Sequence, residues 1–164
     1  MIGAPRSRAS TLEEVAYHEA GHVVVGHRLG IDLDSVDILP DGQGGNGHTV
    51  FNVAPGVRER RDYIEAVVTT FLAGPAAEAR VAGFENPEGS GYDLDAIARE
   101  WLRQLEPEPG NGYRARRAEL GRRADRLVTD SWPQIETLAQ ALLERRRLTR
   151  ADALALLADS GHSA

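Results

Sequence analysis

The spacing of apolar residues at the start of the chain predicts a long first helix. The apolar positions that recur at roughly helical intervals are Val15, Val23, Val24 and Leu29. Thr11 followed by Glu14 has the spacing of a capping box, which marks a helix N-terminus. Gly30 stands where a helix end often carries glycine. Together these features predict a helix over about residues 11–29.

Two short segments rich in β-branched residues come next, and turn-forming residues flank both. They read SVDILP (35–40) and HTVFNVA (48–54), and the glycine-rich loop DGQGGNG lies between them. Short runs of this kind are typical of strands. We therefore expect a small sheet after the first helix.

The remaining sequence favours helices. Residues 57 to about 81 keep helical spacing, with a bend or interruption expected near Gly74 and Pro75. A third amphipathic stretch, YDLDAIAREWLRQL, covers residues 92–105. The predicted fold class is α+β, mainly α-helical with one small β-sheet.

From residue 113 to the end the pattern is helical throughout. A new helix is expected after Asp130 and Ser131, with Pro133 near its start. Thr149 and Asp152 have the spacing to cap a last helix.

Length and composition narrow the class of protein. A chain of 164 residues is long enough for one compact domain, expected over residues 11–158 between flexible stretches at 1–10 and 159–164. It has no cysteine, so His, Asp or Glu must hold any metal ion. The absence of a long apolar run or a signal-peptide pattern predicts a cytoplasmic protein without its own membrane anchor.

The charge of the chain argues against nucleic acid as a partner. The formal net charge is -6, and general nucleic-acid binding usually needs a basic surface. The most basic run, RARRAELGRRADR (114–126), has acidic residues interspersed. We interpret it as a solvated helix face.

The candidate chemistry lies in the first helix, in the sequence HEAGH. His18 and His22 are four residues apart, so both imidazoles project from one helical face and can reach one ion. In a His-Glu-x-x-His motif the histidines bind Zn²⁺, and the glutamate, here Glu19, takes a proton from the metal-bound water. The alternative is a helix with incidental histidines, but two histidines and a glutamate are costly to bury without a purpose.

A catalytic zinc site with two histidines needs a third protein ligand. The residues alone leave four carboxylates as candidates, which are Glu78, Asp93, Asp95 and Glu100. Asp93 is favoured because it follows the glycine-bearing loop EGSGYD, which can bring a helix N-terminus against another helix. The other histidines are expected to have no metal role. His27 faces the other side of the helix, His48 begins a predicted strand, and His162 lies in the C-terminal stretch.

Beyond HEAGH, a series of segments in fixed order resembles the peptidase domain of the FtsH family of ATP-dependent zinc proteases. The segments are AYHEAGHVVVGH, SVDILPDGQGGNGHTVF, LAGPAAEARVAG, GSGYDL and QIETLAQALLERRRLTRADALALL. The resemblance covers nearly the whole chain from about residue 11. Two departures stand out: Pro75 replaces an arginine of the family, and GYDL replaces Ser-Asn-Asp-Leu.

The resemblance implies a set of site residues. His18, His22 and Asp93 would be the zinc ligands, and Glu19 would be the general base. Glu78 would support the ligands without binding the metal. The strand from His48 to Val53 would lie beside the site, where an extended substrate can add by backbone pairing.

The function implied is a zinc-dependent metalloendopeptidase that hydrolyses peptide bonds in unfolded or flexible polypeptides. The chain has no lysine and hence no Walker A lysine, so we expect a stand-alone peptidase domain without the AAA+ module. The family forms hexameric rings, so a homo-oligomer and a separate ATPase are the expected partners beside the substrate. Two alternatives stay open: a non-catalytic zinc-binding or protein-interaction module, and a narrow regulatory protease with one partner substrate.

Overall fold

The computed structural model describes residues 8–42, 46–53, 56, 60–86, 91–105 and 111–160, with the side chains of residues 46, 91–95 and 111 outside that description. The elements are α1 (Leu12–Arg28), β1 (Asp32–Pro40), β2 (Asn46–Asn52), α2 (Arg61–Ala82), α3 (Gly91–Leu102), α4 (Asn111–Asp130), α5 (Trp132–Arg145), β3 (Arg147–Thr149) and α6 (Arg150–Ser160). Helices dominate and the strands form one small sheet. The predicted α+β class is therefore confirmed.

Helix α1 begins and ends where the sequence predicts. The Thr11 hydroxyl accepts a hydrogen bond from the Glu14 N–H at 3.2 Å, and the Glu14 carboxylate accepts one from the Thr11 N–H at 2.8 Å, which completes the capping box. Gly30 follows the helix with a φ of +77°. Every residue from Glu14 to Gly26 is buried, so α1 is a central helix covered on all sides.

The sheet has three antiparallel strands in the order β2-β1-β3. Val36 in the central strand β1 pairs with Thr49 of β2 on one side and with Leu148 of β3 on the other. The two predicted strands are confirmed, but the sequence analysis missed β3. Strand β3 has only three residues and lies inside a helical pattern, so its own alternation is too short to be recognised.

Helix α2 runs without interruption from Arg61 to Ala82, with Pro75 inside it. The interruption that was one of the two outcomes expected at Gly74 and Pro75 is therefore absent, although a proline removes one helical hydrogen bond. Packing on α1 explains why the helix continues: Ala73 and Ala77, on either side of Pro75, are completely buried. Residues 57–59, predicted to begin this helix, lie outside the described residues.

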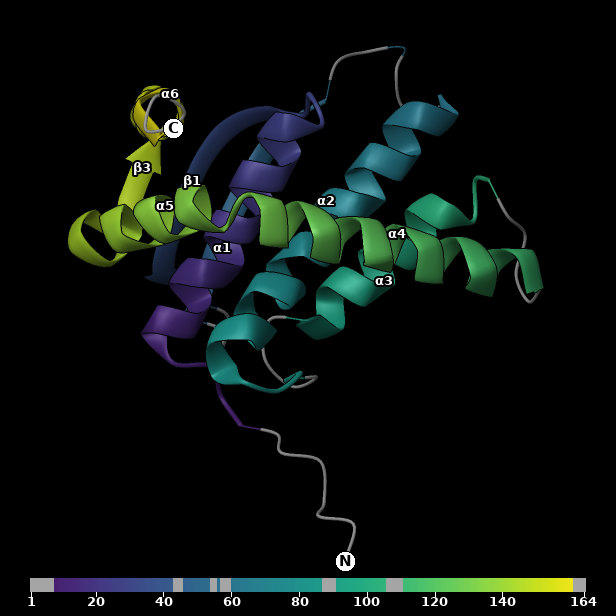
Figure 1. Cartoon of the computed structure of the whole chain (residues 1–164), viewed down its shortest axis with the longest axis horizontal. Coiled ribbons are helices and arrows are strands. Elements are labelled where there is room, and N and C mark those ends of the chain that lie inside the picture. Colours follow the sequence, from purple (N-terminus) through teal and green to yellow (C-terminus); the bar gives the residue numbers. More distant parts are fainter. Residues whose placement is uncertain are drawn as a thin grey trace, which may run out of the picture.

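The close approach of α1 and α2 organises the core. A Cβ placed on Gly21 of α1 would lie 2.7 Å from the Ala73 carbonyl oxygen and 2.8 Å from the Ala77 Cβ, so the two backbones touch through glycine. In Figure 1, α4 and α5 (green) run across the front of α1 and α2, while β1 and β2 lie behind α1. Within the described residues, none of the helices is both long and apolar enough to cross a membrane.

Candidate metal centre

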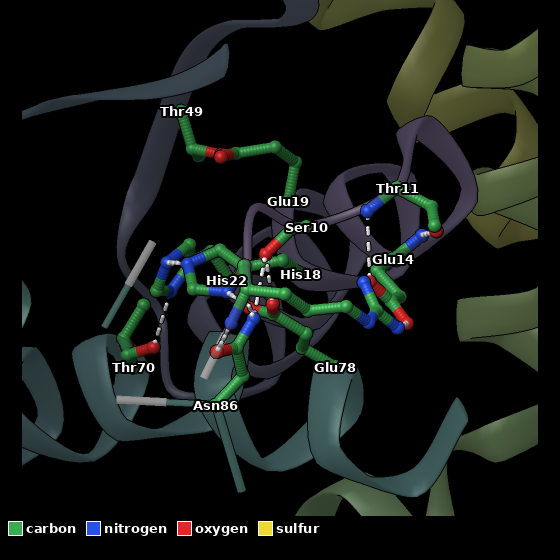
Figure 2. A network of polar contacts seen from close by, with 11 residues as sticks. Ser10, Thr11, Glu14, His18, Glu19, His22, Thr49, Thr70, Glu78 and Asn86 are labelled. Carbon is green, nitrogen blue, oxygen red and sulfur yellow. Dashed lines mark hydrogen bonds and ion pairs between the residues drawn. The ribbon is translucent and has the colours of Figure 1, made fainter. Parts of the chain in front are cut away.

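The two histidines of the HEAGH motif lie side by side in the buried interior. His18 is 1% exposed and His22 is 4% exposed. Their Nε2 atoms are 3.0 Å apart. The helical spacing predicted that both rings would share a face, and the structure brings their nitrogens together at one point (Figure 2).

The other ring nitrogen of each histidine is held by a residue of α2. The Nδ1–H of His22 donates to the Thr70 carbonyl oxygen at 2.8 Å, and Nδ1 of His18 lies 2.8 Å from Oε2 of Glu78. A carbonyl oxygen only accepts hydrogen bonds, and so does an ionised carboxylate, so both rings carry their proton on Nδ1. When both rings are neutral, the Nε2 lone pairs of His18 and His22 therefore face each other, whereas a proton on one Nε2 would join the rings by a hydrogen bond.

Facing lone pairs at 3.0 Å repel unless a proton or a metal cation lies between them. Two nitrogens bound to one tetrahedral zinc at about 2.0–2.1 Å are roughly 3.3 Å apart, so a small ring movement would accommodate the ion. Burial, and then repulsion from His18 when that ring is protonated, lower the pKa of His22 from 6.5 to about 3, and the hydrogen bond to Thr70 opposes this only in part. A neutral imidazole is the form that binds metal, so the donor set fits zinc.

Gly74 of α2 leaves the space in which the two Nε2 atoms lie. A Cβ at this position would be 2.8 Å from the His18 Nε2 and closer still to Cε1 and Nε2 of His22. Only glycine allows the helix backbone to come this near. The sequence analysis interpreted Gly74 with Pro75 as a helix breaker and missed its place beside the histidines.

Glu19 is buried on α1 and is held by the edge strand β2. The Thr49 hydroxyl donates to Oε2 of Glu19 at 2.5 Å, and a Cβ on Gly47 would lie 2.8 Å from Oε1. Gly47 has a φ of +92°, a conformation that favours glycine. Figure 2 shows Glu19 extending toward Thr49, away from Glu78. The resemblance described above implies that the strand from His48 to Val53 lies beside the site, but it does not single out Gly47 or Thr49.

The environment of Glu19 suits a proton acceptor. Burial raises the pKa of its carboxyl group, and the charge of His18 and the hydrogen bond from Thr49 act in the opposite direction. A general base works best when its pKa lies near the working pH. The direction of the net shift is therefore the one that a general base requires.

The third ligand remains a prediction. The backbone places Asp93 in the first turn of α3, a helix that packs against α2, but the side chains of Asp93 and Asp95 lie outside the described residues. Glu100 is exposed and its carboxylate faces Arg103 at 3.7 Å. Glu78 contacts the Nδ1 side of His18, opposite to Nε2. Among the residues whose side chains are described, no group of three His, Cys, Asp or Glu could hold a metal.

The two other histidines that the structure describes, His27 and His48, lie apart from this pair. His27 is exposed near the end of α1. The His48 side chain is 52% exposed, with Nδ1 3.7 Å from the Asp37 carboxylate. His162 lies outside the described residues.

An apolar cavity of about 260 Å³ adjoins the centre. Its lining includes four aromatic side chains, Phe51, Tyr63, Phe71 and Trp101, and four aliphatic ones, Ile31, Val50, Val53 and Val67. Thr49 and Thr70 also line it, and these two residues bond to Glu19 and His22. The cavity and the candidate metal centre therefore share a wall.

Known proteins similar to this chain are ATP-dependent zinc metalloproteases named FtsH. FtsH 1 of Symbiobacterium thermophilum is 40% identical over 161 residues, which cover 88% of this chain and 27% of the relative. FtsH proteins of Metamycoplasma arthritidis and Mycoplasma mobile are 29% and 36% identical over 67% and 49% of this chain, and over 16% and 12% of their own lengths. No family model matches the chain.

The chain spans about a quarter or less of the length of these relatives. The likeness to the first of them nevertheless extends over most of the present sequence. On this evidence the chain belongs to the FtsH family.

Proposed function

We propose that the chain is a zinc-dependent metalloendopeptidase in which His18, His22 and Asp93 hold the metal and Glu19 is the general base. The observation that carries the proposal is the pair of buried imidazoles whose Nε2 atoms lie 3.0 Å apart. The names of the relatives, which are called zinc metalloproteases, support it at the level of the family.

Each residue of the centre would have its own role in the hydrolysis. Zinc bound at the two Nε2 atoms would polarise the scissile carbonyl and lower the pKa of the attacking water. Glu78 and Thr70 keep the two rings oriented with Nε2 inward. Glu19 accepts the proton of the attacking water and passes it to the leaving amine, and Thr49 holds its carboxylate in place.

The surroundings of the centre favour an extended polypeptide as substrate. Strand β2 is an edge of the sheet, and the free edge of a strand can pair with another extended chain. The adjoining cavity is lined mainly by aromatic and aliphatic side chains and would receive an apolar side chain of the substrate. We therefore propose cleavage of unfolded or flexible polypeptides beside large apolar residues.

The cavity gives a direct test of this substrate preference. Val67 of α2 lines the cavity, and none of the contacts described above joins it to the histidines or to Glu19. Val67→Phe should therefore fill the cavity and leave those contacts in place. We expect the variant to raise KM for peptides with a large apolar residue at the cleavage site, with zinc content unchanged. Equal cleavage of such peptides and of their alanine counterparts by the parent protein would contradict the preference.

We further propose that an ATPase delivers unfolded chains to the peptidase site, because the relatives are named as ATP-dependent. The homo-oligomer that we also propose rests on the hexameric rings of the family that the sequence resembles. Without an unfoldase, the purified protein should cleave casein but leave a stably folded reporter intact. Rapid degradation of the folded reporter without ATP would count against this part of the proposal.

Metal content tests the ligand set. We would purify the full chain without a histidine tag and measure zinc per chain for the parent, His22→Gln and Asp93→Ala, with His48→Gln as the control for an exposed histidine. We expect close to one zinc in the parent and the control, and marked loss in the other two. A parent that refuses added zinc would favour a non-catalytic interaction module, and normal zinc in Asp93→Ala would remove Asp93 as a ligand.

A further inference from the structure

The segment just before α1 is tied to both α1 and the turn that follows α2. The guanidinium of Arg8 donates to both carboxylate oxygens of Glu14, at 2.8 Å for the Nη1–Oε2 contact. The side-chain amide of Asn86 donates to the Arg8 carbonyl oxygen at 2.8 Å and to the Ser10 hydroxyl oxygen at 3.3 Å. The segment that contains Ser10 is therefore held by α1 through Arg8 and by Asn86 after α2.

The Arg8 guanidinium also lies over the ring of Phe84, 5.4 Å from its centroid, which is within the range of a cation–π contact. Phe84 and Asn86 both follow α2 in the chain. The segment from Arg8 to Thr11 thus connects the start of α1 with the residues that follow α2. Both helices contribute side chains or backbone atoms to the candidate metal centre.

Ser10 reaches the metal centre through one buried residue. Its hydroxyl donates to Oε1 of Glu78, while Oε2 of the same carboxylate lies 2.8 Å from Nδ1 of His18. Glu78 is 3% exposed and His18 is 1% exposed. Figure 2 shows Ser10, Glu78 and His18 as successive links in one network, with Asn86 beside Ser10.

We propose that Ser10 is a positioning residue of the metal centre, which acts by orienting Glu78 against His18. This inference rests on the proposed role of His18 as a ligand. A glutamate side chain has three rotatable bonds, so a donor at its second oxygen restricts the rotation of the carboxylate further. Donors at both oxygens hold the plane, and the plane in turn holds the His18 ring with Nε2 toward His22.

The rival explanation is a structural one, in which Ser10 only ties the start of α1 to the end of α2. The two explanations predict different effects when the Ser10 hydroxyl is removed. A structural role lowers the stability of the metal-free protein and leaves the geometry at the metal alone. A positioning role changes metal affinity and the ligand field, even where the metal-free protein melts at the same temperature.

The experiment uses the full chain with Ser10→Ala, which removes the hydroxyl, and Ser10→Thr, which keeps it. Ser160→Ala is the matched control, because the Ser160 hydroxyl is also hydrogen-bonded, to the Leu156 carbonyl at the end of α6. The zinc dissociation constant is measured by competition with a chromophoric chelator. The visible absorption spectrum of the Co²⁺-loaded protein reports ligand geometry, and the melting temperature of the metal-free protein reports stability.

We expect Ser10→Ala to weaken zinc binding by about 3–10-fold, since direct partners of metal ligands are worth about 10–100-fold and Ser10 is one contact further away. Its Co²⁺ spectrum should differ from that of the parent, whereas Ser10→Thr and Ser160→Ala should match the parent in both measurements. If Ser10→Ala does not fold, Asn86→Ala replaces it, with a smaller weakening in the same direction.

Parent-like zinc affinity and an unchanged Co²⁺ spectrum in Ser10→Ala would overturn the proposal, whatever happens to the melting temperature. That result would leave the proposed function standing, because the parent would still bind zinc. A parent that binds neither zinc nor Co²⁺ would instead overturn the proposed function itself.

Discussion

Because Gly74 has no side chain, the ring nitrogens of His18 and His22 stay accessible to a metal ion. A Cβ there would clash with ring atoms of both histidines, and both rings are already fixed through Nδ1. We predict that Gly74→Ala lowers zinc affinity about 10-fold or more, the size of effect seen when the support of a ligand is lost. Zinc competition measures the loss, and circular dichroism checks that the helices persist.

A second glycine serves as the control for this substitution. A Cβ on Gly121 in α4 would meet only the Arg117 guanidinium, at 3.7 Å. Gly121→Ala should therefore keep parent-like zinc affinity and raise stability by about 0.5–1 kcal/mol, since glycine is unfavourable inside a helix. Parent-like zinc binding in Gly74→Ala would show that the histidines do not meet the metal where the structure brings them together.

Thr49 offers a prediction about pH. Its hydrogen bond favours the ionised form of Glu19 and so lowers the pKa of that carboxyl group. Thr49→Val removes the bond and should raise the pKa further. Because a general base must be ionised to act, the acidic limb of the kcat/KM profile should move to higher pH with zinc content unchanged. Thr49→Ser should restore the parent profile, and a limb that stays in place or moves to lower pH would argue against Glu19 as the base.

At the scale of elements, the sequence predicted what depends on local pattern and missed what depends on contacts between distant segments. Helix α1 was predictable because its capping box and its histidine spacing lie within one stretch. The supports of the histidines depend on distant residues, since Thr70 and Glu78 lie 48 and 60 residues away from their partners. The family resemblance indicated Glu78, whereas nothing in the sequence indicated Thr70. Thr70 moreover contacts His22 through its backbone carbonyl, a group that every residue type has.

The uninterrupted course of α2 also follows from contacts rather than from local preference. Pro75 alone predicts a break, but the burial of Ala73 and Ala77 against α1 keeps the helix whole. Strand β3 has the same kind of origin, because it exists only by pairing with β1. Likewise, no sequence signal pointed to Ser10, whose contacts with Glu78 and Asn86 span 68 and 76 residues.

The packing of α1 on α2 is itself testable through Gly21. A Cβ at this position would lie 2.7 Å from the Ala73 carbonyl oxygen and 2.8 Å from the Ala77 Cβ. We predict that Gly21→Ala costs about 1–3 kcal/mol of unfolding free energy, as overpacking in a core does. It should also weaken zinc binding, because the supports on α2 move away from α1. Urea denaturation and zinc competition measure the two effects.

A double-mutant cycle tests whether the contact between residues 21 and 77 causes the loss of stability in Gly21→Ala. Ala77→Gly removes one of the two clashing groups, so the double variant Gly21→Ala/Ala77→Gly should lose less stability than the sum of the single changes. Strict additivity would mean that Gly21 and Ala77 do not meet as described.

At the scale of the whole molecule, burial of His22 makes stability depend on pH. The folded protein holds this residue neutral because its pKa is about 3, whereas the ordinary value is 6.5. Between these two values the unfolded chain binds more protons than the folded one. The stability of the metal-free protein should therefore fall as pH drops from about 6.5 toward 3.

Urea midpoints of the metal-free protein across this window test the prediction. His22→Gln removes the titrating group and should give a shallower decline, whereas His27→Gln, which changes an exposed histidine on the same helix, should follow the parent. A His22→Gln profile as steep as that of the parent would mean that His22 is not held neutral by the fold.

Glu19→Gln is the sharpest test of the proposal that zinc held by His18 and His22 of α1 and Asp93 of α3 serves to hydrolyse peptide bonds. The change keeps the shape of the side chain and removes the base, while His18 and His22 keep their hydrogen bonds to Glu78 and Thr70. The measurement is zinc per chain together with cleavage of an unstructured peptide, for the parent and the variant side by side. The account predicts close to one zinc in both proteins and cleavage only by the parent. Cleavage by Glu19→Gln at the parent rate, or zinc-loaded parent protein that cleaves neither casein nor peptides, would contradict it.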